Sequence, residues 1–213
     1  MENVNSFEQG LQRYLSADII RGLQKVKIGI AGAGGLGSNC AQMLVRSGFK
    51  RFKIIDHDFL DCSNLNRQFY FLPQVGLAKV EALAANLQAI NPAVAIEAAQ
   101  IEFRRENAAE IFADCDVIVE AFDKPECKKL LLETYLESGK LVVAASGIAG
   151  WGNSDALKVT KIKKNFYLIG DLTTEATAEN PPLAPKVVLA AAKQADVVLS
   201  YFLEQLTKGE KKS

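Results

Sequence analysis

Residues 30–40 read IAGAGGLGSNC, and Gly32, Gly34 and Gly37 in this stretch match the pattern G-x-G-x-x-G. Glycine-rich backbone lets amide groups approach phosphate oxygens closely, and the positive end of the following helix favours an anion. Gly35, directly after Gly34, adds a fourth glycine in the middle of the loop. The glycines alone are equally compatible with the pyrophosphate of NAD, the triphosphate of ATP, or no phosphate. The flanking sequence is needed to decide which of these ligands the loop binds.

Apolar runs alternate with helical repeats on both sides of this loop. Strands are predicted over residues 26–32, 51–56, 93–99, 115–122 and 141–146, and helices over residues 36–49, 77–91, 106–114 and 124–139. Alternation of this kind predicts an α/β fold with a Rossmann-like, doubly wound and mostly parallel sheet.

The pattern changes after Gly147. Residues 156–164 and 165–170 predict a hairpin, so antiparallel strands are expected after residue 150, and a polar loop over 171–186 precedes an apolar helix over 185–206. We expect one domain over residues 1–213, with an N-terminal helical arm over 1–25 and a flexible tail over 207–213.

Composition excludes several classes of protein. The 213 residues carry 25 basic and 25 acidic side chains, and 49% are hydrophobic. Nothing in this balance indicates binding to nucleic acid or to an anionic membrane. The sequence has no apolar run near the ~20 residues that cross a bilayer and no signal-peptide stretch at its start, so we expect a cytoplasmic protein.

Metal-binding residues are few. The four cysteines form no C-x-x-C pair, and His57 is the single histidine. A structural zinc site needs about four such ligands, usually in close pairs, so we expect no zinc; a cytoplasmic protein is also not expected to carry a disulfide framework.

The residues after the second predicted strand favour ATP over NAD. Asp56 ends that strand about 20 residues after the glycines, where an acidic residue binds ribose hydroxyls of either nucleotide. The continuation DHDFLDCSNLNRQFYF, residues 56–71, places Arg67 in a turn directly beyond, and Lys79 begins a helix twelve residues later. Arg67 and Lys79 would bring two positive charges to the phosphate loop. A triphosphate needs such charges to offset its own during displacement of pyrophosphate, whereas the pyrophosphate of NAD needs fewer.

Asp123 follows the fourth predicted strand, at the ligand-binding edge of such sheets. A carboxylate facing a triphosphate is a natural ligand for Mg²⁺, which takes one or two carboxylates together with phosphate oxygens. The sequence therefore predicts ATP and Mg²⁺ as the cofactors.

Four segments together resemble the adenylating domain shared by ThiF, MoeB and ubiquitin-activating enzymes. They are GIAGAGGLGSN, IIDHDFLDCSNLNRQF, GLAKVEAL and VEAFDKPECK, and the resemblance covers roughly residues 25–205. Such enzymes adenylate the C-terminal Gly-Gly carboxylate of a small ubiquitin-like protein, which implies an acyl-adenylate and pyrophosphate as products. The resemblance implies Gly32, Gly34, Gly35, Gly37, Asp56, Ser63, Asn64, Arg67 and Lys79 as nucleotide ligands, Asp123 as the magnesium ligand, and Arg67, Lys79 and Asp123 as the catalytic group.

Two differences from the family pattern indicate which members this chain resembles most. Longer members carry paired C-x-x-C zinc ligands, and many have a cysteine in the crossover loop; both are missing here, since residues 171–186 contain no cysteine. The chain therefore most resembles the short, zinc-free ThiF-like proteins of thiamine biosynthesis, which implies a homodimer acting on a ThiS-like sulfur carrier. The missing loop cysteine argues against a covalent intermediate with the carrier.

Other interpretations remain open at this stage. Within the family, the activated carboxylate could belong to a molybdopterin-type carrier or to a modified tRNA base that is cyclised; outside it, the chain could be a nucleotide-regulated scaffold. Asp123 could simply cap the helix that begins near Pro125. Lys79 could be a solvated helix lysine, Arg67 a surface ion-pair residue and Cys127 a packing residue.

Overall fold

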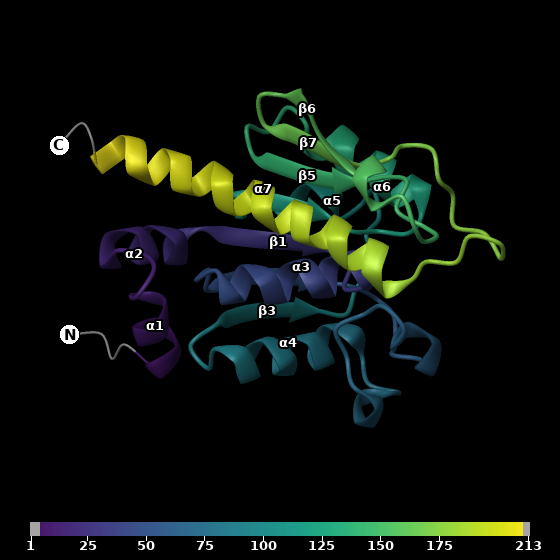
Figure 1. Ribbon diagram of the computed structural model, residues 1–213, viewed down its shortest axis with the longest axis horizontal. Helices are drawn as coiled ribbons and strands as arrows, with labels where there is room; N and C mark the ends of the chain where they lie inside the picture. Colours follow the sequence, from purple (N-terminus) through teal and green to yellow (C-terminus); the bar gives the residue numbers. More distant parts are fainter. Residues whose placement is uncertain (1–4, 211–213) are drawn as a thin grey trace.

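The computed structural model describes residues 5–210, with side chains to residue 208. Its centre is a seven-stranded sheet in the order β3-β2-β1-β4-β5-β7-β6 (Figure 1). The strands are β1 Lys27–Ala31, β2 Arg51–Ile55, β3 Ala95–Ala99, β4 Val117–Glu120, β5 Leu141–Ala145, β6 Lys158–Lys163 and β7 Phe166–Gly170.

Six of these strands are parallel, which confirms the predicted fold class. The edge strand β6 is the antiparallel one, because the chain passes the position beside β5, forms β6, and returns through a hairpin as β7. β6 and β7 are the expected antiparallel pair after residue 150, and β7 also pairs parallel with β5. Strands β1 and β5 are buried at every residue, as expected for central parallel strands covered on both faces.

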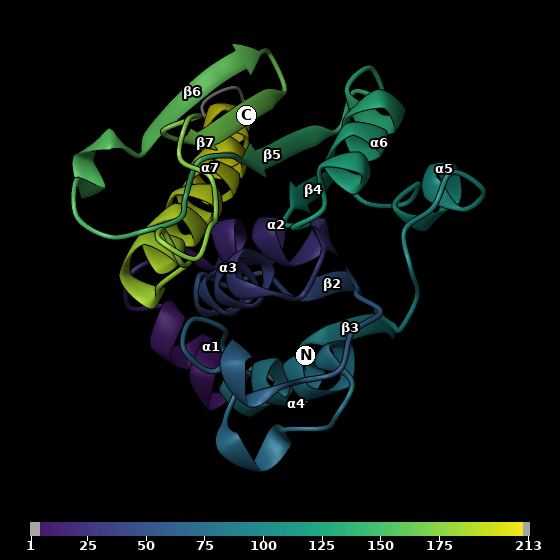
Figure 2. The ribbon, with the colours of Figure 1, turned by 90° about the vertical axis from the view of Figure 1, so that its right-hand side faces the viewer.

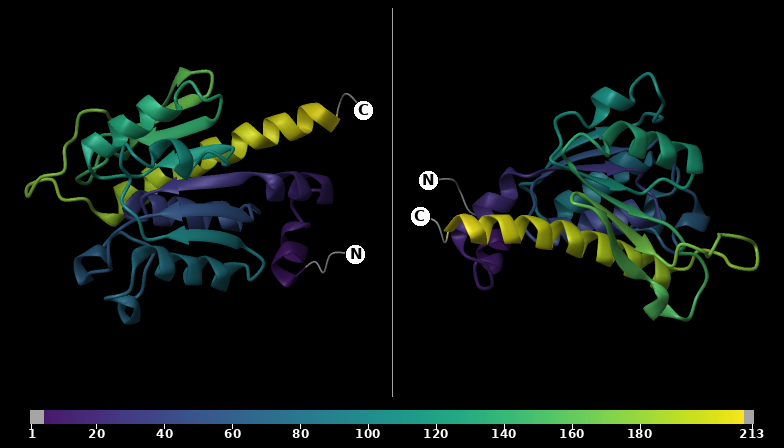
Figure 3. Two further views of the ribbon diagram at one scale, coloured as in Figure 1. Left: turned by 180° about the vertical axis from the view of Figure 1, so that it is seen from behind. Right: turned by 90° about the horizontal axis from the view of Figure 1, so that it is seen from above.

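Helices cover both faces of the sheet. Helices α3 Gly35–Arg46, α4 Lys79–Ile90 and α7 Ala184–Glu210 lie on one face, while the single turn α5 Ala108–Ile111 and α6 Pro125–Tyr135 lie on the other (Figures 1 and 3). Two hydrophobic clusters fill the spaces between sheet and helices, the larger one against α3, α4 and α7. Three short 3₁₀ turns complete the fold, at Cys62–Asn64, Leu72–Gln74 and Ser154–Ala156.

The N-terminal arm forms two helices, α1 Ser6–Leu11 and α2 Ala17–Lys25. The arm packs on the end of α7, where a side-chain atom at Gly22 would meet Leu206 at 2.4 Å. The expected flexible tail begins at residue 207, and α7 continues through residues 207–210. Residues 211–213, like 1–4 of the arm, lie outside the described part. Among the described helices, none combines the length and hydropathy needed to cross a bilayer.

Candidate active site

A cavity of about 440 Å³ lies at the C-terminal ends of the parallel strands. Figure 2 shows this end of the sheet facing the viewer. Of the predicted site residues, it is lined by Gly32, Gly34, Gly35, Asp56, Asn64, Arg67, Lys79 and Asp123. Ligands of open α/β sheets bind at this edge, so most of the predicted residues converge where the topology requires.

The glycines of the loop have different tasks. Gly32 has φ +102°, and a Cβ there would lie 2.8 Å from the Ala121 carbonyl oxygen. A Cβ at Gly37 would lie 1.8 Å from the Gly32 carbonyl oxygen, and Gly37 does not line the cavity. Gly37 therefore lets α3 approach β1, whereas Gly34 and Gly35 leave the start of α3 open to the cavity.

Asp56 ties the end of β2 to this loop. One carboxylate oxygen accepts a hydrogen bond from the Ala33 amide at 2.7 Å, and the other accepts one from the Asp58 amide at 2.9 Å. The side chain lines the cavity with its remaining acceptor capacity. Its contact with a ribose stays a prediction.

Buried polar side chains of α3 fix the turn that carries Arg67. The Asn39 amide donates to the carbonyl oxygens of Gly35 at 2.7 Å and Arg67 at 2.8 Å. Ser38 accepts a hydrogen bond from the Phe69 amide at 3.0 Å and donates to the Gly34 carbonyl at 2.7 Å. These bonds hold the turn against the phosphate loop. The sequence signal was the polar pair Ser-Asn in the first two turns of α3, and neither residue was among the predicted site residues.

Arg67 lies half-buried over the start of α3. Its guanidinium donates to the Asn66 side chain at 2.7 Å and to the Ser63 carbonyl at 3.3 Å, and no ion pair to it occurs among the described residues. Burial lowers the pKa of Arg67, although the Asp123 carboxylate nearby opposes the shift. An arginine stays charged in either case, so Arg67 presents a cation to the cavity.

Ser63 does not line the cavity. It is exposed in the 3₁₀ turn, where its amide donates to Asp61, while Asn64 closes the capping box from the other side. The predicted nucleotide contact of Ser63 stays a prediction, and it concerns a residue outside the cavity lining.

Lys79 is buried at the first position of α4 rather than solvated. Its ammonium lies 2.6 Å from the Asp58 carboxylate, and both residues line the cavity. Burial alone would raise the pKa of Asp58, but the hydrogen bond and the charge of Lys79 lower it below the usual value. The Tyr70 hydroxyl lies 2.7 Å from the Ala33 carbonyl oxygen and 3.2 Å from that of Lys79, which fixes the helix start beside the phosphate loop.

Asp123 does not cap α6. The capping position is Lys124, which makes no side-chain cap hydrogen bond. Among the described residues, Asp123 has no hydrogen-bond or ion-pair partner, and its exposed carboxylate lines the cavity. A free carboxylate opposite a phosphate loop fits a Mg²⁺ ligand.

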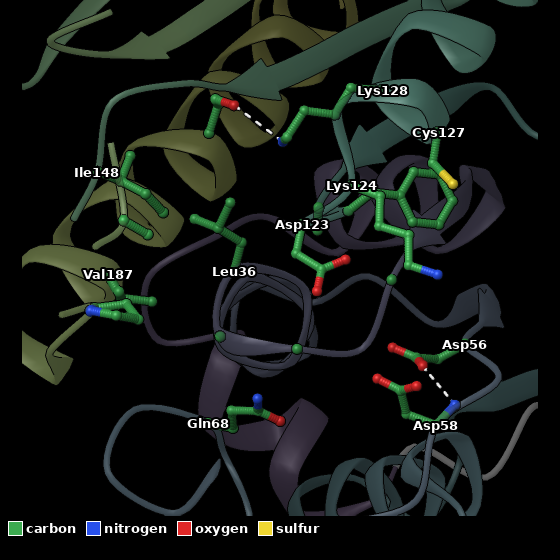
Figure 4. A pocket seen from close by; sticks show the side chains of 18 of the residues that line it. Leu36, Asp56, Asp58, Gln68, Asp123, Lys124, Cys127, Lys128, Ile148 and Val187 are labelled. Carbon is green, nitrogen blue, oxygen red and sulfur yellow. Dashed lines mark hydrogen bonds between the residues drawn. The ribbon is translucent and has the colours of Figure 1, made fainter. Parts of the chain in front are cut away.

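The cavity has two sides separated by Asp123 and Leu36. Figure 4 shows Asp56, Asp58 and Cys127 on one side and Ile148 and Val187 on the other. Phe103 packs against Phe122 and its carbonyl lies near the Cys127 thiol, which places these aromatic residues on the first side. The second side is lined by Ser146–Ala149, Thr174, Ala176, Pro182 and Val187, none of which has an ionisable side chain, and it was not predicted from the sequence. Arg67 borders this second side, since a Cβ at Gly35 would lie 2.8 Å from Val187 Cγ1 and 3.5 Å from Arg67 Cγ.

A buried ion pair supports the strand ends below Asp123. Glu120 is 1% exposed, and both of its oxygens lie 3.0 Å from the Lys128 ammonium, which also donates to the Ala145 carbonyl. Burial raises the pKa of Glu120, while Lys128 opposes the shift. The stem of Lys128 lines the cavity, so the pair links β4, β5 and α6 at its floor.

Cys127, interpreted above as a packing residue, is partly buried and lines the cavity. Burial raises the pKa of its thiol, which disfavours the thiolate form needed for a nucleophile.

We expect the purified protein to contain no stoichiometric zinc. In the described part of the chain, one group of three possible metal ligands occurs, Asp56, His57 and Asp58, and it holds no cysteine, while Lys79 already engages Asp58. Structural zinc is held by four ligands, mostly thiolates and imidazoles. Elemental analysis of protein purified without chelators checks this; about one zinc per chain would contradict it.

Comparisons with known proteins agree with this arrangement. Residues 9–191 match the ThiF family. The chain is 30% identical over 208 residues to the adenylyltransferase and sulfurtransferase uba4 of Ogataea parapolymorpha, covering 93% of this chain and 52% of the relative. It is 37% identical over 141 residues to UBA4 of Candida glabrata, covering 66% and 33%. The chain thus spans about a third to a half of the length of these curated relatives.

Solved structures share the fold. The tRNA N6-threonylcarbamoyladenosine dehydratase TcdA of E. coli, in complex with AMP, superposes with a TM-score of 0.85 at 18% identity, covering 96% of this chain and 98% of that one. E. coli MccB with ATP gives a TM-score of 0.70 at 20% identity, covering 94% and 64%.

Proposed function

Because the chain belongs to the ThiF family, we propose that it is an ATP-dependent adenylyltransferase that activates the C-terminal Gly-Gly carboxylate of a small ubiquitin-like, ThiS-type sulfur carrier. The observation that carries this proposal is the cavity that joins the open start of α3, the cations of Arg67 and Lys79 and the free carboxylate of Asp123 to a second side lined by small and apolar residues. The first side suits a nucleoside triphosphate, and the second suits a short segment without charged side chains.

The proposed reaction needs positioning and electrostatic stabilisation more than a protein nucleophile. An oxygen of the carrier carboxylate forms a bond to the α-phosphorus. The bond from that phosphorus to the oxygen bridging to the β-phosphate breaks, and pyrophosphate leaves with that oxygen. Arg67 lies over the start of α3, where it would offset charge on the phosphates, and Lys79 would do so for the leaving pyrophosphate.

Asp123 would hold Mg²⁺, whose charge would further offset that of the triphosphate. Asp56 would bind the ribose from the opposite side of the phosphate loop. We also propose that the enzyme works as a homodimer in the cytoplasm, in thiamine biosynthesis.

ATP–pyrophosphate exchange tests the proposed activity. Labelled pyrophosphate enters ATP only if an adenylate forms reversibly, so a nucleotide-regulated scaffold gives no exchange. Exchange with a recombinant ThiS-type protein ending in Gly-Gly, and none with the same protein lacking its last two residues, is the expected result. Exchange with a molybdopterin-type carrier alone would move the proposal to that carrier.

The nucleotide is expected to be ATP with Mg²⁺ rather than NAD. Two cations and a free carboxylate around the loop match a charged triphosphate better than the pyrophosphate of a dinucleotide. Calorimetry is expected to show ATP binding that weakens when Mg²⁺ is removed and negligible binding of NAD. Tight binding of NAD would contradict the assignment.

A further inference from the structure

Lys186 lies behind the uncharged side of the cavity. It is the third residue of α7, its side chain is 6% exposed, and it does not line the cavity itself. Its ammonium donates to the Ala149 carbonyl oxygen at 2.8 Å and lies 3.3 Å from the Asp171 carboxylate. The residue thereby joins three segments, the loop after β5, the loop after β7 and the first turn of α7.

Each of these three segments contributes to the wall of the cavity. Ser146–Ala149 follow β5, Thr174 and Ala176 follow β7, and Val187 is the neighbour of Lys186 in α7. Val187 also faces the phosphate loop, since a Cβ at Gly35 would lie 2.8 Å from its Cγ1 atom. The distance between this wall and the phosphate loop therefore depends on how Lys186 is held.

Asp171 organises the loop on the other side of the ion pair. Its carboxylate accepts hydrogen bonds from the Thr173 amide at 3.0 Å, the Thr174 amide at 2.8 Å and the Thr174 hydroxyl at 2.6 Å. Its own amide donates to the Gly147 carbonyl at 3.1 Å. Burial alone would raise the pKa of Asp171, but these hydrogen bonds and Lys186 hold it well below the usual value, so the carboxylate stays charged.

The position of Lys186 is unfavourable for α7 itself. Cations are destabilising near the positive end of a helix, and a buried ammonium costs free energy unless it is paired and hydrogen-bonded. The same length of side chain without charge would serve helix stability better. The ammonium therefore contributes through the three segments that it joins rather than through the stability of α7.

We infer that Lys186 is a positioning residue for the second substrate of the proposed reaction, acting through the wall that it ties together. The inference rests on the proposed function. The wall is the part of the cavity without ionisable side chains, and a carboxylate-bearing segment must lie along it to reach the phosphate loop. Asp56, which is assigned to the ribose, lies on the opposite side, beyond Asp123 (Figure 4).

The variant Lys186→Met removes the ammonium and keeps the length of the side chain. With a recombinant ThiS-type carrier, its KM for the carrier in ATP–pyrophosphate exchange is expected to rise about tenfold, while the Kd for ATP with Mg²⁺ stays within about twofold. Lys186→Arg, which keeps a cation, is expected to recover part of the loss. Lys193→Met, two turns further along α7 and outside the cavity, is the matched control and is expected to behave as wild type.

Loss of folding is separated from loss of positioning by a second variant. Lys186→Met combined with Asp171→Asn leaves no unpaired buried charge, so it is expected to stay folded and still show the raised KM. An unchanged carrier KM in this folded double variant would overturn the inference. So would a loss of ATP affinity as large as the rise in KM.

A readout without activity separates this inference from the proposed function. A glutamate-specific protease can cut the exposed loop after Glu175 and Glu179. Lys186→Met is expected to speed cleavage there at least about threefold, because the loop opens more often, whereas Lys193→Met leaves it unchanged. If wild type gives no exchange with any carrier, the proposed function fails; if cleavage is equally fast in Lys186→Met and wild type, the inference fails.

Discussion

Replacing Asp123 by alanine is expected to lower the rate of ATP–pyrophosphate exchange by about a hundredfold or more. The carboxylate has no partner among the described residues and faces the phosphate loop, so its contribution lies in the bound complex rather than in the fold. Loss of one charged contact made mainly in the transition state costs about 3 kcal/mol. The melting temperature is expected to change by no more than about 2 °C, since the exposed side chain that is removed makes no hydrogen bond or ion pair among the described residues.

Two further variants test the assigned roles, one expected to lose exchange and one expected to keep it. Arg67→Ala is expected to lower exchange to a similar extent, because it removes a cation from the start of α3. Cys127→Ala is expected to keep near-normal exchange, since the carrier carboxylate is the nucleophile and the thiol pKa is raised. Exchange that stops in Cys127→Ala and persists in Asp123→Ala would show that the assigned roles are wrong.

The parallel core of the fold could be predicted because its signals are local. Continuous apolar runs predict the buried strands β1, β4 and β5, and all of β1 to β5 lie within the predicted ranges. The direction of β7 could not be predicted, because a hairpin fixes only the relation of two strands to each other. Which of them inserts beside β5 depends on tertiary packing.

Motif spacing predicted the charged side of the site better than single residues did. Asp56 and Asp123 reach the cavity because each follows the C-terminal end of a strand, Lys79 because it begins α4, and Arg67 because it lies in the turn after Cys62–Asn64. The burial of Lys79 depends on Asp58 and Tyr70, which meet it only in the folded chain. Ser63 shared the motif with Asn64, but only Asn64 lines the cavity.

The uncharged side of the site had no recognisable signal. Its lining residues are small or apolar and come from loops after β5 and β7, so nothing in their type distinguishes them from ordinary loop residues. Lys186 and Asp171 are fifteen positions apart, and their pairing follows from the return of the chain into α7. Such pairs are determined by the topology of the fold and cannot be predicted from patterns in the sequence.

Gly37→Ala is expected to have the largest effect on stability. The new Cβ would lie 1.8 Å from the Gly32 carbonyl oxygen, and backbone cannot move aside as the end of a flexible side chain does. Either α3 shifts away from β1 or the phosphate loop is displaced, so we expect destabilisation of roughly 3 kcal/mol or more together with loss of ATP binding.

Gly10→Ala is the matched control for that substitution. Gly10 is also helical, and a Cβ there would meet nothing within 4 Å. Alanine is the better helix former, so this variant is expected to be neutral or to gain up to about 1 kcal/mol. Urea denaturation of the two variants beside wild type measures both effects. Equal urea midpoints for Gly37→Ala and Gly10→Ala would contradict the prediction. They would show that position 37 accepts a side chain despite the close approach of α3 to the phosphate loop.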